Sequence, residues 1–182
     1  MNYPNKKSVF NKSIVSYGNR GMNLESDVNN SNKYYLENDI AIIHKKPTPI
    51  KVIKLNYNTN KIDEAYYETP STTDYNGLYK GKYIDFDAKE TNSKTSFPLN
   101  NIHSHQIKHL INIKNHGGIS FLIIRFNTLN ETYLFETKYL EDFINNNERK
   151  SIPYNYIKDN GYLIEESYYP RLKYIEIVDK IL

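Results

Sequence analysis

The chain has 182 residues, a formal net charge of +3 at pH 7 and no cysteine, which excludes disulfides and thiolate metal sites. No apolar stretch is long enough to cross a bilayer, and no apolar secretion signal begins the chain, so we expect a cytoplasmic protein without membrane contact. The length is typical of one domain with its own core, and the mild charge does not by itself demand a polyanionic partner.

The beginning of the chain differs in composition from the rest. Residues 1–24 contain no acidic side chain, and their basic residues are Lys6, Lys7, Lys12 and Arg20. We predict a basic flexible arm over residues 1–19 and a single domain over residues 20–182. Such an arm is attracted to phosphates, with Arg20 as a DNA contact, although an ordinary basic terminus explains the same composition equally well.

A short helix is predicted over residues 21–32, because Leu24 and Val28 lie one helical turn apart. Glu25 falls in its first turn. A carboxylate at this place either completes a metal site or simply favours the helix through its dipole.

Two strands follow, over residues 40–44 and 50–55, both rich in β-branched side chains. The prolines at residues 47–49 separate them, and we expect the two strands to pair as a hairpin. Residues 57–80 are less regular and contain Asn76-Gly77, a strong turn signal, so this segment is predicted to project as an arm.

Residues 83–89 alternate between two kinds of side chain, as a strand does. Ile84, Phe86 and Ala88 form the predicted core face. The opposite face gathers Tyr83, Asp85, Asp87 and Lys89. Two acids and a lysine side by side are unusual on a strand in the middle of a sheet.

A helix is predicted over residues 101–116, closed by Gly117. Gln106 falls on its apolar side, where an amide without partners would cost about 1–3 kcal/mol, so something polar should face it. His105 and His109 lie one turn apart, as a metal pair or as a face toward solvent or phosphates.

The rest of the chain continues the alternation of strands and helices. Residues 120–126 predict a strand buried on both faces, residues 133–136 a strand that could pair with it, and residues 137–146 and 174–182 two helices. We therefore expect an α/β fold with a sheet flanked by helices.

The residues that indicate chemistry are Asp74, Asp87, Lys89 and Gln106, with Thr72 two positions before Asp74. Carboxylates are hard oxygen ligands that suit Mg²⁺, and an ammonium beside them can stabilise the charge of a reacting phosphate. The set therefore favours a Mg²⁺-dependent phosphodiesterase. On spacing alone, a surface ion-pair ladder explains Asp87 and Lys89 as well, and Asp85 is a third acid of the site or a neighbour of it.

Candidate DNA contacts surround this set. Tyr66 and Tyr67 could stack on exposed bases or pack at the root of the projecting arm. The lysines that flank the site in the sequence and could hold backbone phosphates are Lys45, Lys46, Lys80 and Lys82.

Six blocks of this sequence resemble the RecU family of Holliday junction resolvases. They are residues 20–25 (RGMNLE), 43–49 (IHKKPTP), 71–77 (STTDYNG), 83–91 (YIDFDAKET), 96–99 (SFPL) and 105–107 (HQI). They occur in the family's order with the right gaps, from about Tyr17 to the C-terminus.

The resemblance implies a restriction-endonuclease-like fold of the PD-(D/E)xK type, a mixed central sheet flanked by helices with a projecting stalk at about residues 57–80. It implies a homodimer that nicks four-way DNA symmetrically in recombination and repair and that modulates the recombinase RecA. The family's ligands for Mg²⁺, for which Mn²⁺ could substitute, fall here on Thr72, Asp74, Asp87 and Gln106, and its transition-state lysine falls on Lys89.

One position departs from the family pattern. Asp87 stands where the family usually has glutamate, whose carboxylate reaches one methylene further. Because of this departure, a second interpretation is that the protein binds junctions or regulates the recombinase without cutting DNA. A sequence-specific restriction enzyme is a third and less favoured interpretation.

Overall fold

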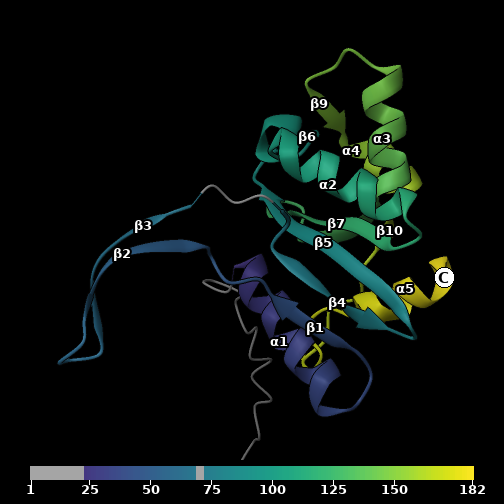
Figure 1. Cartoon of the computed structure of the whole chain (residues 1–182). Helices are drawn as coiled ribbons and strands as arrows, with labels where there is room; N and C mark the ends of the chain where they lie inside the picture. Colours follow the sequence, from purple (N-terminus) through teal and green to yellow (C-terminus); the bar gives the residue numbers. More distant parts are fainter. Residues whose placement is uncertain (1–22, 69–71) are drawn as a thin grey trace, which may run out of the picture.

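The computed structural model describes residues 23–68 and 72–182, and Arg20 and the predicted arm over residues 1–19 lie outside them (Figure 1). Its centre is a six-stranded sheet in the order β1-β4-β5-β7-β8-β10. The strands are β1 (Ile42–Lys45), β4 (Tyr75–Tyr79), β5 (Lys82–Thr91), β7 (Ile119–Phe126), β8 (Glu131–Glu136) and β10 (Tyr162–Leu163). β5 and β7 run parallel and the other neighbouring pairs antiparallel, so the predicted mixed sheet is confirmed.

Helices cover both faces of this sheet (Figure 1). α1 (Leu24–Glu37) and α5 (Tyr174–Ile181) pack on one face, and α2 (Ser104–Asn115), α3 (Thr137–Asn146) and α4 (Tyr154–Asn160) on the other. Successive residues of a strand point to opposite faces of the sheet, and β7 contributes apolar side chains to the core on each face. Phe121 and Ile123 join the α1 side while Leu122 and Ile124 join the α2 side, all fully buried. This confirms the prediction of a strand buried on both faces.

The first helix begins later and ends later than predicted. Asn23 caps it by accepting a hydrogen bond from the backbone N–H of Ser26 at 2.9 Å, so the helix starts at Leu24 and continues to Glu37. Its buried residues include Leu24, Val28 and Tyr35, spaced so that one side faces the sheet.

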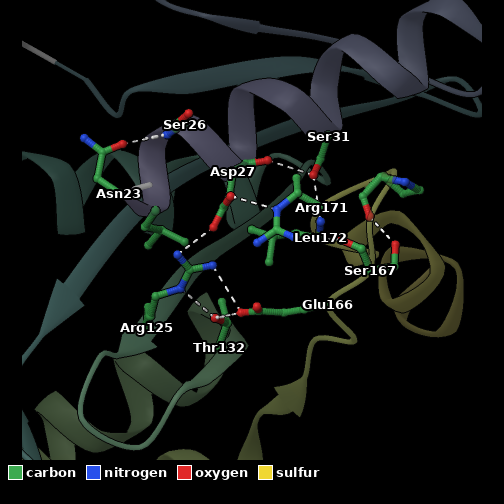
Figure 2. Close-up of polar contacts among 12 residues, drawn as sticks. Asn23, Ser26, Asp27, Ser31, Arg125, Thr132, Glu166, Ser167, Arg171 and Leu172 are labelled. Atoms are coloured by element: carbon green, nitrogen blue, oxygen red, sulfur yellow. Dashed lines mark hydrogen bonds and ion pairs between the residues drawn. The ribbon is translucent and has the colours of Figure 1, made fainter. Parts of the chain in front are cut away.

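A buried ion network fixes α1 to the far end of β7 and to the C-terminal segment (Figure 2). Asp27 lies 2.7 Å from a terminal guanidinium nitrogen of Arg125 and 3.1 Å from Nε of Arg171. Arg125 also contacts Glu166 at 3.2 Å and donates to Thr132 at 3.0 Å. Buried charges need such partners, and these join three segments that are distant in sequence.

The projecting segment is a two-stranded ribbon of β2 (Ile50–Asn56) and β3 (Lys61–Tyr67) that forms a sheet of its own (Figure 1). The predicted hairpin of residues 40–44 with 50–55 is therefore wrong, because β1 pairs with β4 and β2 with β3. Residues that precede proline favour extended backbone, so residues 46–49 carry the chain straight out of the sheet.

The predicted arm over residues 57–80 thus has different limits. The ribbon already begins at Ile50, and Tyr75–Tyr79 is strand β4 of the central sheet. The β4–β5 turn lies at Lys80-Gly81, where both residues have positive φ, and not at Asn76-Gly77. Gly77 has another reason to be glycine: a Cβ there would lie 2.1 Å from the carbonyl oxygen of Ile42 on β1.

The remaining elements lie near their predicted places. A 3-10 turn (Leu99–Asn101) precedes α2, which ends before Gly117 at φ 81°, and α3 spans the predicted residues. Two short strands, β6 (Ser96–Pro98) and β9 (Ser151–Pro153), pair beside α2. Within the described parts of the chain, none of the helices combines the length and the apolar character needed to span a bilayer.

Candidate active site

The polar face of β5 points toward α2. Gln106 of α2 donates a hydrogen bond to Oδ2 of Asp87, and His109, one turn later, lies 3.2 Å from Oδ2 of Asp85. Ile84 and Phe86 point the other way, into the core with α1. The predicted alternation is confirmed, but both faces are covered: Asp85 and Asp87 are as fully buried as their apolar neighbours.

Asp87 is the buried centre of the site. Nζ of Lys89 lies 3.2 Å from its Oδ1, which is buried and accepts no hydrogen bond. Burial raises the pKa of the Asp87 carboxyl to about 7; the charge of Lys89 opposes this rise, and the charge of Asp74 adds to it. Asp87 thus combines a poorly satisfied oxygen with a nearby negative charge, an arrangement that a cation would stabilise.

Asp74 reaches Asp87 because of the register of two strands. Tyr75, the first residue of β4, pairs with Phe86 of β5, so Asp74 stands at the strand end next to Asp87. Their side chains are close enough for Asp74 to act directly on the pKa of Asp87. The backbone carbonyl of Asp74 accepts a hydrogen bond from the N–H of Lys46 at 2.7 Å, which ties the segment to the end of β1.

A pocket of about 350 Å³ opens beside Asp74. Its lining consists of Glu25, Lys45, Lys46, Pro47, Thr48, Pro49, Thr72, Thr73 and Asp74. Glu25 and Lys45 form an ion pair of 2.5 Å across it. The structure therefore brings the predicted residues Glu25, Thr72 and Asp74 to one place.

The two lysines of this pocket differ in their surroundings. Lys45 is exposed at the rim, whereas the ammonium of Lys46 lies 2.9 Å from Asp85 and 3.0 Å from the hydroxyl of Thr73. Sequence reasoning placed Lys46 among the phosphate contacts and missed these bonds. The polar alternation around Asp85 was the available signal, but nothing in the sequence named its partners.

Other predicted contacts lie away from the site. Lys80 sits at the opposite end of the β4–β5 hairpin, paired with Asp179 at 2.5 Å, so it does not flank the pocket as expected. Tyr66 and Tyr67 lie at the base of the ribbon, where Tyr67 pairs with Ile50, and they are 49% and 78% exposed. Tyr67 is therefore open to solvent rather than packed at the root.

The donors present suit a hard divalent cation. They are the two carboxylates, the half-buried Thr72 and the amide of Gln106. Over residues 23–68 and 72–182, no group of three or more histidine, cysteine, aspartate or glutamate residues is arranged to hold a metal. A cation beside Asp87 would therefore take neutral oxygens as well. The amide nitrogen of Gln106 faces Asp87, and its oxygen accepts from the N–H of His103 at 3.1 Å, so Gln106 would have to turn its amide to offer the oxygen to a cation.

Comparison with known proteins decides the family. The sequence profile of RecU, described as Recombination protein U, matches residues 19–180. The chain belongs to the RecU family. Proteins named Holliday junction resolvase RecU from Staphylococcus aureus strains JH9 and COL are each 50% identical to it over 200 aligned positions, covering 100% of this chain and 96% of theirs.

Among solved structures, this RecU-family chain is similar to Hjc of Archaeoglobus fulgidus, a Holliday junction resolvase. The TM-score is 0.44 at 8% identity, over 75% of this chain and 94% of Hjc.

Proposed function

We propose that this RecU-family protein is a Mg²⁺-dependent, structure-selective endonuclease that resolves four-way DNA junctions by symmetric nicking in recombination and repair. The observation that carries the proposal is the pair of carboxylates, Asp74 and Asp87, beside the ammonium of Lys89. The match covers nearly the whole length of the relatives, and their name, Holliday junction resolvase, supports the same function.

The cation would be held by Thr72, Asp74, Asp87 and Gln106, with Mn²⁺ as a substitute for Mg²⁺. When bound, it would draw charge from a phosphate oxygen and make water a better nucleophile near neutral pH. The raised pKa of Asp87 fits the role of a metal ligand. Without metal the buried carboxyl tends to hold a proton, and a bound cation would displace that proton.

Lys89 would stabilise the negative charge that develops on the phosphate during in-line attack. Its side chain is largely buried, so its charge acts through less water than a surface lysine's would. The products would carry a 5′-phosphate and a 3′-hydroxyl. Glu25 would help to orient the attacking water from the opposite wall of the pocket, and its pairing with Lys45 keeps that wall in place.

Branched DNA would approach across this pocket. Lys45 and Lys46 line it and would attract the phosphates, while the exposed Tyr66 and Tyr67 would meet bases at the foot of the ribbon. Lys80, at the other end of the β4–β5 hairpin, would make a more distant contact, and Arg20 remains a proposed DNA contact. A two-fold dimer would place two such sites on the two symmetric strands of a junction. We further propose that the protein is cytoplasmic and modulates the recombinase RecA, as the family resemblance implies.

The test is cleavage of a labelled, mobile four-way junction by the purified protein in Mg²⁺. We expect Asp74→Ala, which removes a ligand of the cation, and Lys89→Ala, which removes a positive charge beside the phosphate, each to lower the rate by about 10²-fold or more. Junction binding, measured in Ca²⁺ by gel shift, should change little. Loss of binding in both variants would instead assign these residues to folding, and intact junction after long incubation with the wild type would contradict the proposal.

Asp87 itself favours a second candidate, a junction-binding or recombinase-regulating protein that does not cut. Its carboxylate is one methylene shorter than the family's usual glutamate and is fully buried. Asp87→Glu separates the two functions. Cutting that appears only in this variant would identify the natural chain as a binding protein, whereas cutting by both identifies a nuclease.

A further inference from the structure

Asp85 lies next to the site but outside the proposed ligand set. It is fully buried, and four side chains reach it from different parts of the chain. The hydroxyl of Thr73 donates to Oδ1. On Oδ2, Lys46 lies at 2.9 Å, the hydroxyl of Tyr83 at 2.9 Å and Nε2 of His109 at 3.2 Å.

These contacts leave Asp85 little capacity to bind a cation. A carboxylate has about four acceptor positions, and four neighbours already use Asp85. Asp87, two residues further along the same strand face, has fewer neighbours: Gln106 donates to Oδ2, and Oδ1 has an ion pair with Lys89 at 3.2 Å but accepts no hydrogen bond. The two neighbouring acids therefore have different roles, a distinction that the alternating sequence could not make.

The partners of Asp85 lie on the segments that carry the proposed ligands. Thr73 stands between Thr72 and Asp74 in a stretch that belongs to no strand. Lys46 holds the same stretch twice, through its ammonium on Thr73 and through its backbone N–H on Asp74. On the other side, His109 lies on α2 one turn after Gln106, which contacts Asp87.

We infer that Asp85 is a positioning residue, which sets the distance between the carboxylates of Asp74 and Asp87 and thereby the affinity of the site for a divalent cation. Asp85 contacts Thr73 before β4, Lys46 after β1 and His109 on α2, and so connects these three segments to β5. Without its charge, the half-buried ammonium of Lys46 loses its counter-ion and Thr73 loses its acceptor. Asp74 is then held only by its backbone hydrogen bond to Lys46 and by the pairing of Tyr75 beside it. The inference rests on the proposed function.

The sharpest test is at Thr73, where one small substitution removes the hydroxyl and another keeps it. Thr73→Val keeps the shape of the side chain but cannot donate to Asp85, whereas Thr73→Ser keeps the hydroxyl. We expect Thr73→Val to weaken Mn²⁺ binding about 10–100-fold, as loss of a residue that orients a ligand typically does, and Thr73→Ser to keep wild-type affinity. Isothermal titration with Mn²⁺ alone measures both, without any cleavage.

Asp85→Asn should weaken Mn²⁺ binding by a similar factor, slow junction cutting and leave junction affinity in Ca²⁺ unchanged. Asp27→Asn is its matched control, because Asp27 is an equally buried aspartate with two cationic partners in a separate network. Both variants should lower the melting temperature, but only Asp85→Asn should affect Mn²⁺.

Two outcomes would overturn the inference. One is Asp85→Asn with Mn²⁺ affinity within about twofold of the wild type, which would make Asp85 a stabilising residue only. The other is equal Mn²⁺ affinity of Thr73→Val and Thr73→Ser. A wild-type protein that binds no Mn²⁺ at all would instead contradict the proposed function, and this result differs from both.

Discussion

At the scale of single residues, the ionised form of Asp87 is destabilised in the folded protein. Asp87 is buried beside a second carboxylate, and its pKa is raised to about 7, mainly by burial. In an unfolded chain the same carboxyl titrates near its usual value of about 4. Folding therefore favours the protonated form, and the contribution of Asp87 to stability is lost as the pH rises from the unfolded to the folded pKa.

Because the ionised form of Asp87 is unfavourable in the folded protein, a neutral substitute should stabilise it. Asp87→Asn mimics the protonated carboxyl, so without metal it should melt higher than the wild type at pH 8 and show little advantage at pH 4 to 5. Thermal melts in EDTA at both pH values measure the difference. An advantage that is the same at both values would contradict the shifted pKa, and the variant should have lost cleavage in Mg²⁺.

The residues of the site could be predicted only in part. The alternation of residues 83–89 was sufficient to place Asp85, Asp87 and Lys89 on one face, because a strand fixes that geometry. The bonds of Asp85 could not be predicted, since they depend on how β1, the segment before β4 and α2 meet in space. Lys80 was misplaced for a related reason: it is close to Asp87 in sequence, but the strand carries it to the opposite end.

At the scale of elements, the ribbon of β2 and β3 is an unusual part of the chain. Among the residues that the structure describes, its two strands pair only with each other. Its exposed apolar side chains include Ile50, Val52, Ile53, Leu55 and Ile62. A hairpin of two strands is marginal alone in water. Exposed apolar surface on such an element is typical of a binding surface, and the junction is the ligand that the proposed function supplies.

Shortening the ribbon should therefore separate binding from folding. Replacement of residues 52–65 by an Asn-Gly turn removes no residue of either core cluster, so the melting temperature should fall by no more than a few degrees. Junction affinity should fall by about tenfold or more, which corresponds to roughly 1.4 kcal/mol. A cooperative melt with unchanged junction affinity would show that the ribbon serves another purpose.

Most elements were predictable because their patterns are local. α3 and β7 follow from periodicity and from an apolar run, and the structure places them within a residue of the prediction. Strand pairing was not predictable in the same way. The glycine at residue 77 favoured a turn by local rules, whereas its real constraint is the close approach of β1, a contact between distant segments.

At the scale of the whole molecule, the network around Asp27 joins the first helix to the sheet and the C-terminal segment (Figure 2). Asp27→Ala would remove this carboxylate from the buried guanidinium of Arg125 and the half-buried guanidinium of Arg171. We expect a loss of about 3–5 kcal/mol in the free energy of unfolding, the usual result of removing one partner from a buried ion pair. Urea titration measures it, and a change below about 1 kcal/mol would show that the network contributes little.

The whole account depends on a divalent cation between Asp74 and Asp87, beside Lys89. A crystal soaked in Mn²⁺ and measured at the manganese absorption edge locates such an ion directly. The account predicts an anomalous peak within coordinating distance of both carboxylates, with Thr72 or Gln106 completing the ligands. Manganese found only elsewhere on the protein, with the two carboxylates hydrogen-bonded to each other, would contradict it.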